Sequence, residues 1–166
     1  MNDAVWSTGI LTLSDKGAAG EREDLSGQTI RELLGDGPFR VDEYAVVPDD
    51  RDTIVETLVE WADKRGLALI LTTGGTGVSP RDVTPEATRA VLHRELPGMA
   101  EAMRWVSYQK TPHAVISRAV AGIRDRCLIV NLPGSPKAVR ENLEAILPAV
   151  PHALAKIHGD PADCAS

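Results

Sequence analysis

Short apolar runs alternate with amphipathic stretches along most of this chain. Residues 5–13, 40–47 and 66–72 have the β-branched and apolar content of strands, and a polar or glycine-containing turn follows each of them. The run 66–72 is apolar at nearly every position, which is typical of a strand covered on both faces. Between and after these runs, apolar residues recur at helical spacing, and we expect helices near 24–35, 51–64, 85–94, 98–108 and 135–147.

The order of these elements predicts the fold. Two further apolar runs, 113–123 and 127–132, flank a polar turn and are expected to form a β-hairpin. Strands that alternate with helices build a parallel sheet covered on both faces, and the hairpin adds an antiparallel edge. We therefore expect an α/β fold, a three-layer α/β/α sandwich with a mostly parallel sheet, as a single domain over residues 1–158. Residues 159–166 are expected to form a disordered tail.

Composition narrows the range of functions. The 166 residues are 43% hydrophobic and 25% charged, which suits one globular domain. A formal net charge of −6 argues against a nucleic-acid partner, because phosphate backbones require a basic surface. No apolar run approaches the roughly 18 residues that span a bilayer, and the chain does not start with a signal-peptide pattern. We expect a cytoplasmic protein without membrane attachment.

The most informative stretch is LTTGGTGVSPRDVTPEAT at residues 71–88. Its three glycines permit positive φ and leave backbone N–H groups uncovered, so the turn can form a concave ring of donors for a phosphate. Two threonines add hydroxyl groups. An ordinary glycine turn remains the alternative, because the stretch contains neither a Walker loop nor a GxGxxG pattern. The candidate phosphate-binding residues are Thr73, Gly74, Gly75, Thr76 and Gly77.

Two acidic positions are candidates for chemistry. Thr84 and Pro85 read as an N-cap and a first helical residue, and Asp82 lies between the glycines and this helix start, where a carboxylate can hold Mg²⁺ beside substrate phosphates. Asp49 and Asp50 follow the second strand, and one of them is needed as the N-cap of the next helix. The other is a candidate site residue, because ligands bind at the carboxyl ends of such strands. The alternative for each carboxylate is a role in its turn only.

The last strand is followed by a second helix start with the same design. Gly134 precedes Ser135, which can cap a helix beginning at Pro136, and Lys137 adds a positive charge. Two helix starts at strand ends strengthen the expectation of a phosphate site. Arg118 stands among apolar neighbours; it either pairs with another residue or faces an anion.

Several of these segments, taken together and in order, form a signature over most of the chain. It is similar to the signature of the molybdenum-cofactor biosynthesis family of MogA/MoaB type. The resemblance runs from residue 10 to about residue 154. The matching segments are LTLSD at 11–15, ERED with LSG at 21–27, VPDD at 47–50, TTGGTG at 72–77, PRDVTPEAT at 80–88, LPGMAEAMR at 96–104, SRAVAGI at 117–123 and LPGSPKA at 132–138.

The resemblance implies a homotrimer that binds molybdopterin and transfers AMP from Mg-ATP to its terminal phosphate, with release of pyrophosphate. By position, Asp49 and Asp82 match the two acidic residues required for the transfer and would hold Mg²⁺. A molybdenum-insertion enzyme is the implied downstream partner. The remaining candidate substrate-binding residues are Ser14, Asp15, Ser107, Arg118, Gly134, Ser135 and Lys137.

Two other functions stay open at this point. A non-catalytic molybdopterin-binding or scaffold protein would keep the glycine turn but could dispense with Asp49 and Asp82. An unrelated nucleotide hydrolase would turn over ATP without any pterin. Retention of both aspartates favours the adenylyltransferase.

Overall fold

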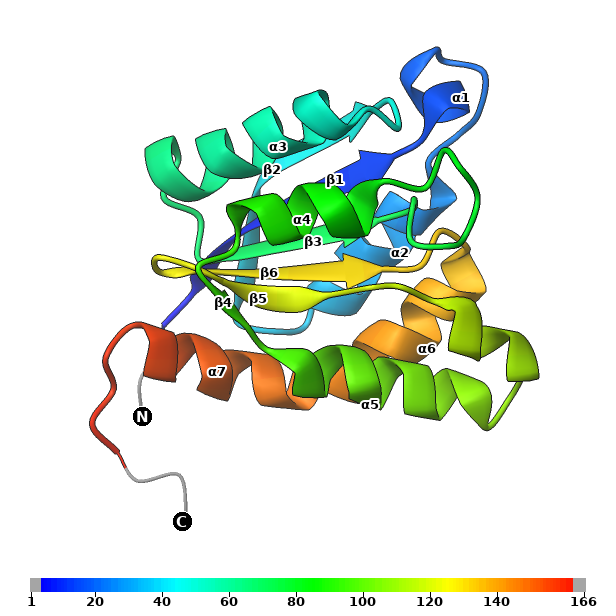
Figure 1. Cartoon of the computed structure of the whole chain (residues 1–166). Helices are drawn as coiled ribbons and strands as arrows, with labels where there is room; N and C mark the ends of the chain where they lie inside the picture. The colour runs from blue at the N-terminus through cyan, green and yellow to red at the C-terminus, as the bar shows by residue number, and fades with distance from the viewer. Residues whose placement is uncertain (1–3, 163–166) are drawn as a thin grey trace.

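A six-stranded mixed sheet forms the centre of the protein, seen in a computed structural model that describes residues 4–162 (Figure 1). The strand order is β2-β1-β3-β6-β5-β4. Strands β1, β2, β3 and β6 are parallel, and β5 runs antiparallel to both of its neighbours. The strands are β1 (Trp6–Leu13), β2 (Phe39–Val47), β3 (Leu69–Thr73), β4 (Arg94–Glu95), β5 (Ala121–Arg124) and β6 (Cys127–Leu132). The predicted α/β sandwich with a mostly parallel sheet and an antiparallel end is confirmed.

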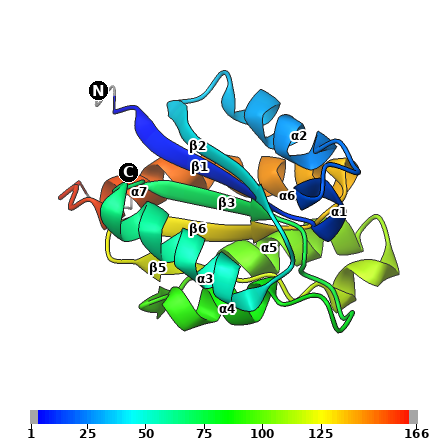
Figure 2. The ribbon, with the colours of Figure 1, turned by 90° about the horizontal axis from the view of Figure 1, so that it is seen from above.

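Helices cover both faces of the sheet and complete the three layers. Viewed from above, α3 and α4 lie on one face, and α2, α6 and α7 lie on the other (Figure 2). The α-helices are α1 (Asp15–Ala18), α2 (Leu25–Leu34), α3 (Arg51–Val59), α4 (Thr84–Val91), α5 (Pro97–Tyr108), α6 (Pro136–Ile146) and α7 (Val150–Ile157). Shorter helical segments are η1 (Glu60–Lys64), η2 (Pro112–Ile116) and η3 (Leu147–Ala149). None of the helices within 4–162 is long and apolar enough to cross a membrane.

Strand alternation divides the apolar core into two clusters. In β3, Leu69 and Leu71 pack on the side of α2, α5, α6 and α7, whereas Ile70 packs on the side of α3 and α4. All three side chains are fully buried, because successive strand residues point to opposite faces and both faces carry helices. The layered core therefore holds the sheet rigidly, and the loops at its carboxyl edge are anchored at one end by buried strands.

The predictions for two segments were wrong. Residues 113–123 were expected to form one long strand, but residues 112–116 are the short helix η2 and only 121–124 are β5. The helix expected to reach residue 94 ends at Val91, and the next residues form β4, which pairs antiparallel with β5 at the edge of the sheet. Ladder bonds to Gly122 and Ile123 thus outweigh the helix preference of Arg94 and Glu95.

Two smaller expectations complete the comparison. A polar turn was expected after the first strand, and residues 15–18 there form the short helix α1. The tail expected over 159–166 lies partly outside the described residues, which end at 162. The strand ends that matter for function all meet at one edge, where α1 and the loops after β2, β3 and β6 gather (Figure 1).

Candidate functional site

The glycine turn follows β3 directly and lies against two neighbouring strands. Gly74 and Gly75 have φ of 99° and 66°, a region that favours glycine. The Gly74 N–H donates to the carbonyl of Leu132 at the end of β6 (3.2 Å). A Cβ on Gly74 would lie 2.4 Å from the carbonyl oxygen of Leu13 at the end of β1. Glycine is therefore required here, because only a bare backbone approaches both strand ends so closely.

The hydroxyls of Thr73 and Thr84 hold the turn in place. Thr73 Oγ1 donates to the carbonyl of Pro133 (2.6 Å), which ties the turn to the loop after β6. The prediction that Thr84 is an N-cap was wrong: the cap residue is Val83, and the buried Thr84 hydroxyl donates to the carbonyl of Gly74 (2.9 Å). This bond satisfies a carbonyl that the turn would otherwise bury without a partner.

Asp49 and Asp82 approach the glycine turn from two different loops. The position of a Cβ on Gly75 would be 3.1 Å from Asp49 Oδ1, and that of a Cβ on Gly77 would be 2.8 Å from Asp82 Oδ2. The sequence had left either Asp49 or Asp50 as the helix cap. Asp50 is the cap, since its carboxylate accepts the N–H of Thr53 (2.9 Å), and Asp49 points to the turn instead.

The two carboxylates form a site of concentrated negative charge. Burial raises the pKa of Asp49 above its ordinary value, and the negative charges of Asp15 and Asp82 act in the same direction, against a hydrogen bond from the Asp15 N–H and the charge of Arg81. A bound cation would relieve this repulsion. The described residues contain no cluster of three or more His, Cys, Asp or Glu able to hold a metal alone. Two carboxylates suit Mg²⁺, which completes its oxygen shell with water and substrate phosphates.

Asp15 connects the loop after β1 to this site. The backbone N–H of Asp15 donates to Asp49 Oδ2 (3.2 Å), and the N–H of Asp49 donates back to Asp15 Oδ1 (3.0 Å). Arg81, which precedes Asp82, forms an ion pair with the Asp15 carboxylate (2.7 Å). Its hydrogen bond lowers the pKa of Asp15. Asp15 is thus a link between three loops, and sequence reasoning missed its partner Arg81.

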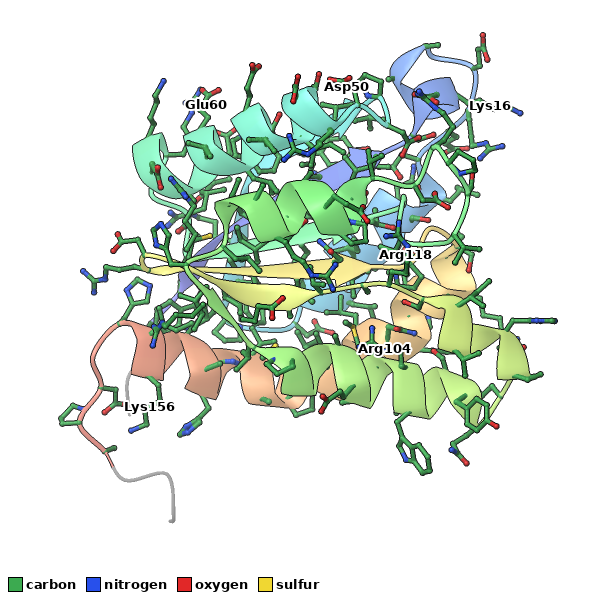
Figure 3. The ribbon with its side chains drawn as sticks, in the orientation of Figure 1. Lys16, Asp50, Glu60, Arg104, Arg118 and Lys156 are labelled. Atoms are coloured by element: carbon green, nitrogen blue, oxygen red, sulfur yellow. The ribbon has the colours of Figure 1, made fainter. Side chains whose placement is uncertain are left out.

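Arg118 holds the far side of the turn. Its Nε donates to the carbonyl of Gly77 (2.6 Å) and its Nη2 to the carbonyl of Asp82 (2.7 Å), while the guanidinium pairs with Glu86 on α4. Of the two alternatives for this residue, the structure therefore shows pairing with other residues. Figure 3 shows Arg118 close to the loop between β3 and α4, and Arg104 below it near α5.

A cavity of about 410 Å³ opens directly beside the glycine turn. Gly75, Thr76, Gly77 and Asp82 line one side of it, and Gly134 lies at the loop after β6. The other side consists of the end of α5, the segment η2 and the first turns of α6. The predicted residues that line this cavity are Gly75, Thr76, Gly77, Asp82, Ser107 and Gly134.

The remaining predicted residues have local roles. Ser14 accepts the N–H of Gly17 (3.0 Å) as the cap of α1, and Ser135 accepts the N–H of Ala138 (3.2 Å) as the cap of α6. The second helix start thus has the predicted design, with Pro136 as its first residue. Lys137 is exposed on α6 and does not line the cavity.

Two polar residues that sequence reasoning missed support the site from within. Asn131, fully buried in β6, donates to the hydroxyls of Thr72 and Thr88 (3.0 Å each) and so ties β3 to α4. Arg104 Nη1 donates to the carbonyl of Ala119 (2.9 Å) beneath the cavity. A polar residue inside the apolar run CLIVNL was the signal that could have identified Asn131.

Comparisons with known proteins agree with this arrangement. A family model described as "Probable molybdopterin binding domain" matches residues 9–152. The molybdopterin adenylyltransferase of Helicobacter pylori (strain J99 / ATCC 700824) is 46% identical over 155 residues, 92% of this chain and 88% of that protein. The molybdopterin adenylyltransferase of Escherichia coli K12 is 41% identical, over 91% of this chain and 77% of that protein.

The structural comparison extends the match to the arrangement of the elements. The crystal structure of the molybdopterin biosynthesis enzyme MoaB from Thermus thermophilus superimposes with a TM-score of 0.89 at 57% sequence identity, covering 95% of this chain and 99% of that one. The family model spans most of the domain built around the glycine turn, and the relatives are similar over nearly the whole chain. The chain belongs to the molybdopterin-binding domain family of molybdenum-cofactor biosynthesis.

Proposed function

We propose that this protein is a molybdopterin adenylyltransferase, which transfers AMP from Mg-ATP to the terminal phosphate of molybdopterin and releases pyrophosphate. The observation that carries the proposal is the approach of Asp49 and Asp82, from separate loops, to one glycine turn beside a cavity. The names of the H. pylori and E. coli relatives support the activity. Family membership alone would also fit a scaffold, and the presence of both carboxylates at the turn favours the transferase.

The reaction joins two anions, and the site offers what that requires. An oxygen of the molybdopterin phosphate attacks the α-phosphorus of ATP, a new P–O bond forms, and the bond to the departing pyrophosphate breaks. The attacking phosphate is already ionised, so no side chain has to remove a proton. The chain's task is to hold both phosphates in line and to stabilise their charge.

Different groups of the site share this task. Backbone N–H groups of the turn around Gly75 and Gly77 would donate to phosphate oxygens, and the amino ends of α4 and α6 lie at the same edge of the sheet. Asp49 and Asp82 would hold Mg²⁺, which when bound neutralises phosphate charge. Arg118 would act by positioning, because it fixes the carbonyls of Gly77 and Asp82.

The test is pyrophosphate release in the presence of Mg-ATP and molybdopterin. We expect release from the wild type and a loss of roughly a hundredfold or more in Asp49→Asn and Asp82→Asn, the size typical of removing one electrostatic stabiliser. Asp50→Asn is the matched control, because Asn also caps helices and Asp50 serves as a cap. No release from the wild type would favour the non-catalytic binding protein, and full activity of Asp82→Asn would remove the role assigned to Asp82.

We also propose the homotrimer that the resemblance implies. Trp105 and Tyr108 on α5, together with Val115 and Ile116, expose between 49% and 66% of their surface. Large apolar side chains gathered in this way are typical of subunit contacts. Sedimentation of Trp105→Glu at several concentrations tests this, since a charge in a subunit contact would dissociate the assembly. A cytoplasmic location and a molybdenum-insertion enzyme as the downstream partner remain predictions of the same proposal.

A further inference from the structure

The wall of the cavity that α5 and α6 form carries a second polar group. Glu141, on the second turn of α6, lines the cavity, and only 16% of its side chain is exposed. Its carboxylate pairs with Lys110 just after α5 (3.2 Å). Its neighbour Asn142 is buried and donates from Nδ2 to Ser107 Oγ (2.6 Å). The contact between α5 and α6 therefore brings a carboxylate and a hydroxyl to the same wall of the cavity.

This pair of groups has a defined hydrogen-bonding pattern. A carboxylate accepts several hydrogen bonds, so the bond to Lys110 leaves Glu141 with further acceptor capacity. Ser107 Oγ already accepts from Asn142, so its own O–H is available to donate. The wall thus presents acceptors beside a donor. The complementary ligand edge has two adjacent N–H donors and a neighbouring carbonyl.

A pterin has such an edge and adenine does not. In a 2-amino-4-oxopteridine, the 2-amino group and N3–H are adjacent donors, and O4 beside them is an acceptor. Adenine offers one amino group flanked by bare ring nitrogens, which a carboxylate repels. A carboxylate that binds two N–H groups at once forms the strong, directional kind of hydrogen bond. The cavity volume of about 410 Å³ lies within the usual range for a small-molecule site.

We propose that Glu141 binds the amino and N3–H groups of the pterin ring, with Ser107 donating to O4, and that this contact selects the pterin substrate over adenine. The inference rests on the proposed function, whose substrates it assigns to different sides of the site. The ring lies in the cavity between α5 and α6, and its phosphate points to the glycine turn. ATP approaches from the other side, where Asp15 and Asp49 lie.

A purely structural role for Glu141 makes a different prediction. Lys110 is half exposed, and an ion pair of this kind contributes little to folding. If Glu141 served only that pair, replacing Lys110 would have the same effect as replacing Glu141. If Glu141 binds the ring, Lys110→Gln keeps the selectivity for pterin and Glu141→Gln loses it.

Binding of free heterocycles tests the inference without any turnover. Ligand-observed NMR titrations would give dissociation constants for pterin, for lumazine, in which an oxo group replaces the 2-amino group, and for adenine. We expect the wild type to bind pterin roughly ten- to a hundredfold more tightly than lumazine, the ratio typical of losing a hydrogen bond to a charged group. Adenine should not displace pterin. Equal affinities, no pterin binding, or displacement by adenine would each overturn the proposal.

The variants then assign the selectivity to one residue. Glu141→Gln should bind pterin and lumazine about equally, whereas Glu144→Gln, an exposed glutamate on the same helix, should behave as the wild type. Pterin selectivity that persists in Glu141→Gln overturns the inference even if pyrophosphate release is normal. Selective pterin binding that depends on Glu141, in a protein that releases no pyrophosphate, would instead leave the inference standing and refute the proposed function. The comparison of pterin, lumazine and adenine on the wild type tests the selectivity for pterin even if a variant fails to fold.

Discussion

The close packing of the glycine turn leads to a prediction about folding stability at Gly74. Two features act against a side chain there: φ is 99°, and a Cβ would lie 2.4 Å from the carbonyl oxygen of Leu13. Backbone strain of this kind costs about 1–3 kcal/mol, and forced overpacking adds about 1–3 kcal/mol. We therefore expect Gly74→Ala to lower the free energy of unfolding by about 2–6 kcal/mol.

Two other glycines separate these causes. Gly20 has φ of 75° but nothing within 4 Å of its Cβ position, so Gly20→Ala measures the backbone cost alone, about 1–2 kcal/mol. Gly98 lies exposed in the first turn of α5 with an ordinary φ and open space, so Gly98→Ala should be neutral or stabilise by up to about 1 kcal/mol. The three alanine variants therefore form a graded series.

Urea denaturation followed by tryptophan fluorescence provides the measurement. The expected order of destabilisation is Gly74→Ala, then Gly20→Ala, then Gly98→Ala, with similar denaturant slopes for all three. A loss in Gly74→Ala no larger than that in Gly20→Ala would refute the reasoning. It would mean that the turn can move away from β1, so that its position beside Asp49 is not set by packing.

Three further predictions concern the groups around the site. Thr84→Val leaves the buried carbonyl of Gly74 without its partner and should destabilise the fold by about 1–3 kcal/mol. Thr84→Ser keeps a hydroxyl and should retain most of the stability. Equal unfolding midpoints for the two variants would contradict this. Arg118→Met should lower kcat/KM for pyrophosphate release roughly tenfold or more by loosening the turn, with a smaller effect on unfolding; unchanged kinetics would show that the turn needs no clamp. Burial, with the hydrogen bond to Asp24, raises the pKa of Tyr44 to about 12. The folded state therefore keeps this proton to a higher pH than the unfolded state does. The stability that this difference provides should be lost as the pH rises from about 10 to about 12. Absorbance titration at alkaline pH, with Tyr44→Phe as the comparison, should show the late phase only in the wild type.

Most of the sheet could be predicted from the sequence because two independent signals marked the same strands. Buried strands such as 69–73 are apolar throughout, and glycine and proline mark the turns around them. The prediction of one strand over 113–123 failed because its apolar residues lie in two different environments. Those of η2 border the cavity, whereas those of β5 pair within the sheet. Periodicity over so few residues does not distinguish these environments.

The site was predictable where a residue's role depends on its own loop. The glycine turn and the Ser135 cap are local features. The sequence also narrowed the site carboxylate after the second strand to Asp49 or Asp50. The contacts that cross the fold were not predictable. Arg81 meets Asp15 only because the loops after β1 and β3 converge, and Glu141 faces the cavity only because α6 packs against α5. Such contacts depend on tertiary structure, and the spacing of residues in the sequence does not predict them.

The proposed transfer depends on Asp49 and Asp82 together holding one divalent cation against the phosphates of ATP. Electron paramagnetic resonance of Mn²⁺, used in place of Mg²⁺, measures this by titration in the presence of ATP. We expect one ATP-dependent Mn²⁺ site per chain in the wild type and in Asp50→Asn, weakened by about tenfold or more in Asp49→Asn and in Asp82→Asn, as expected when a bound cation loses one of two charged ligands. Unchanged Mn²⁺ affinity in both of these variants would contradict the assignment of the two carboxylates.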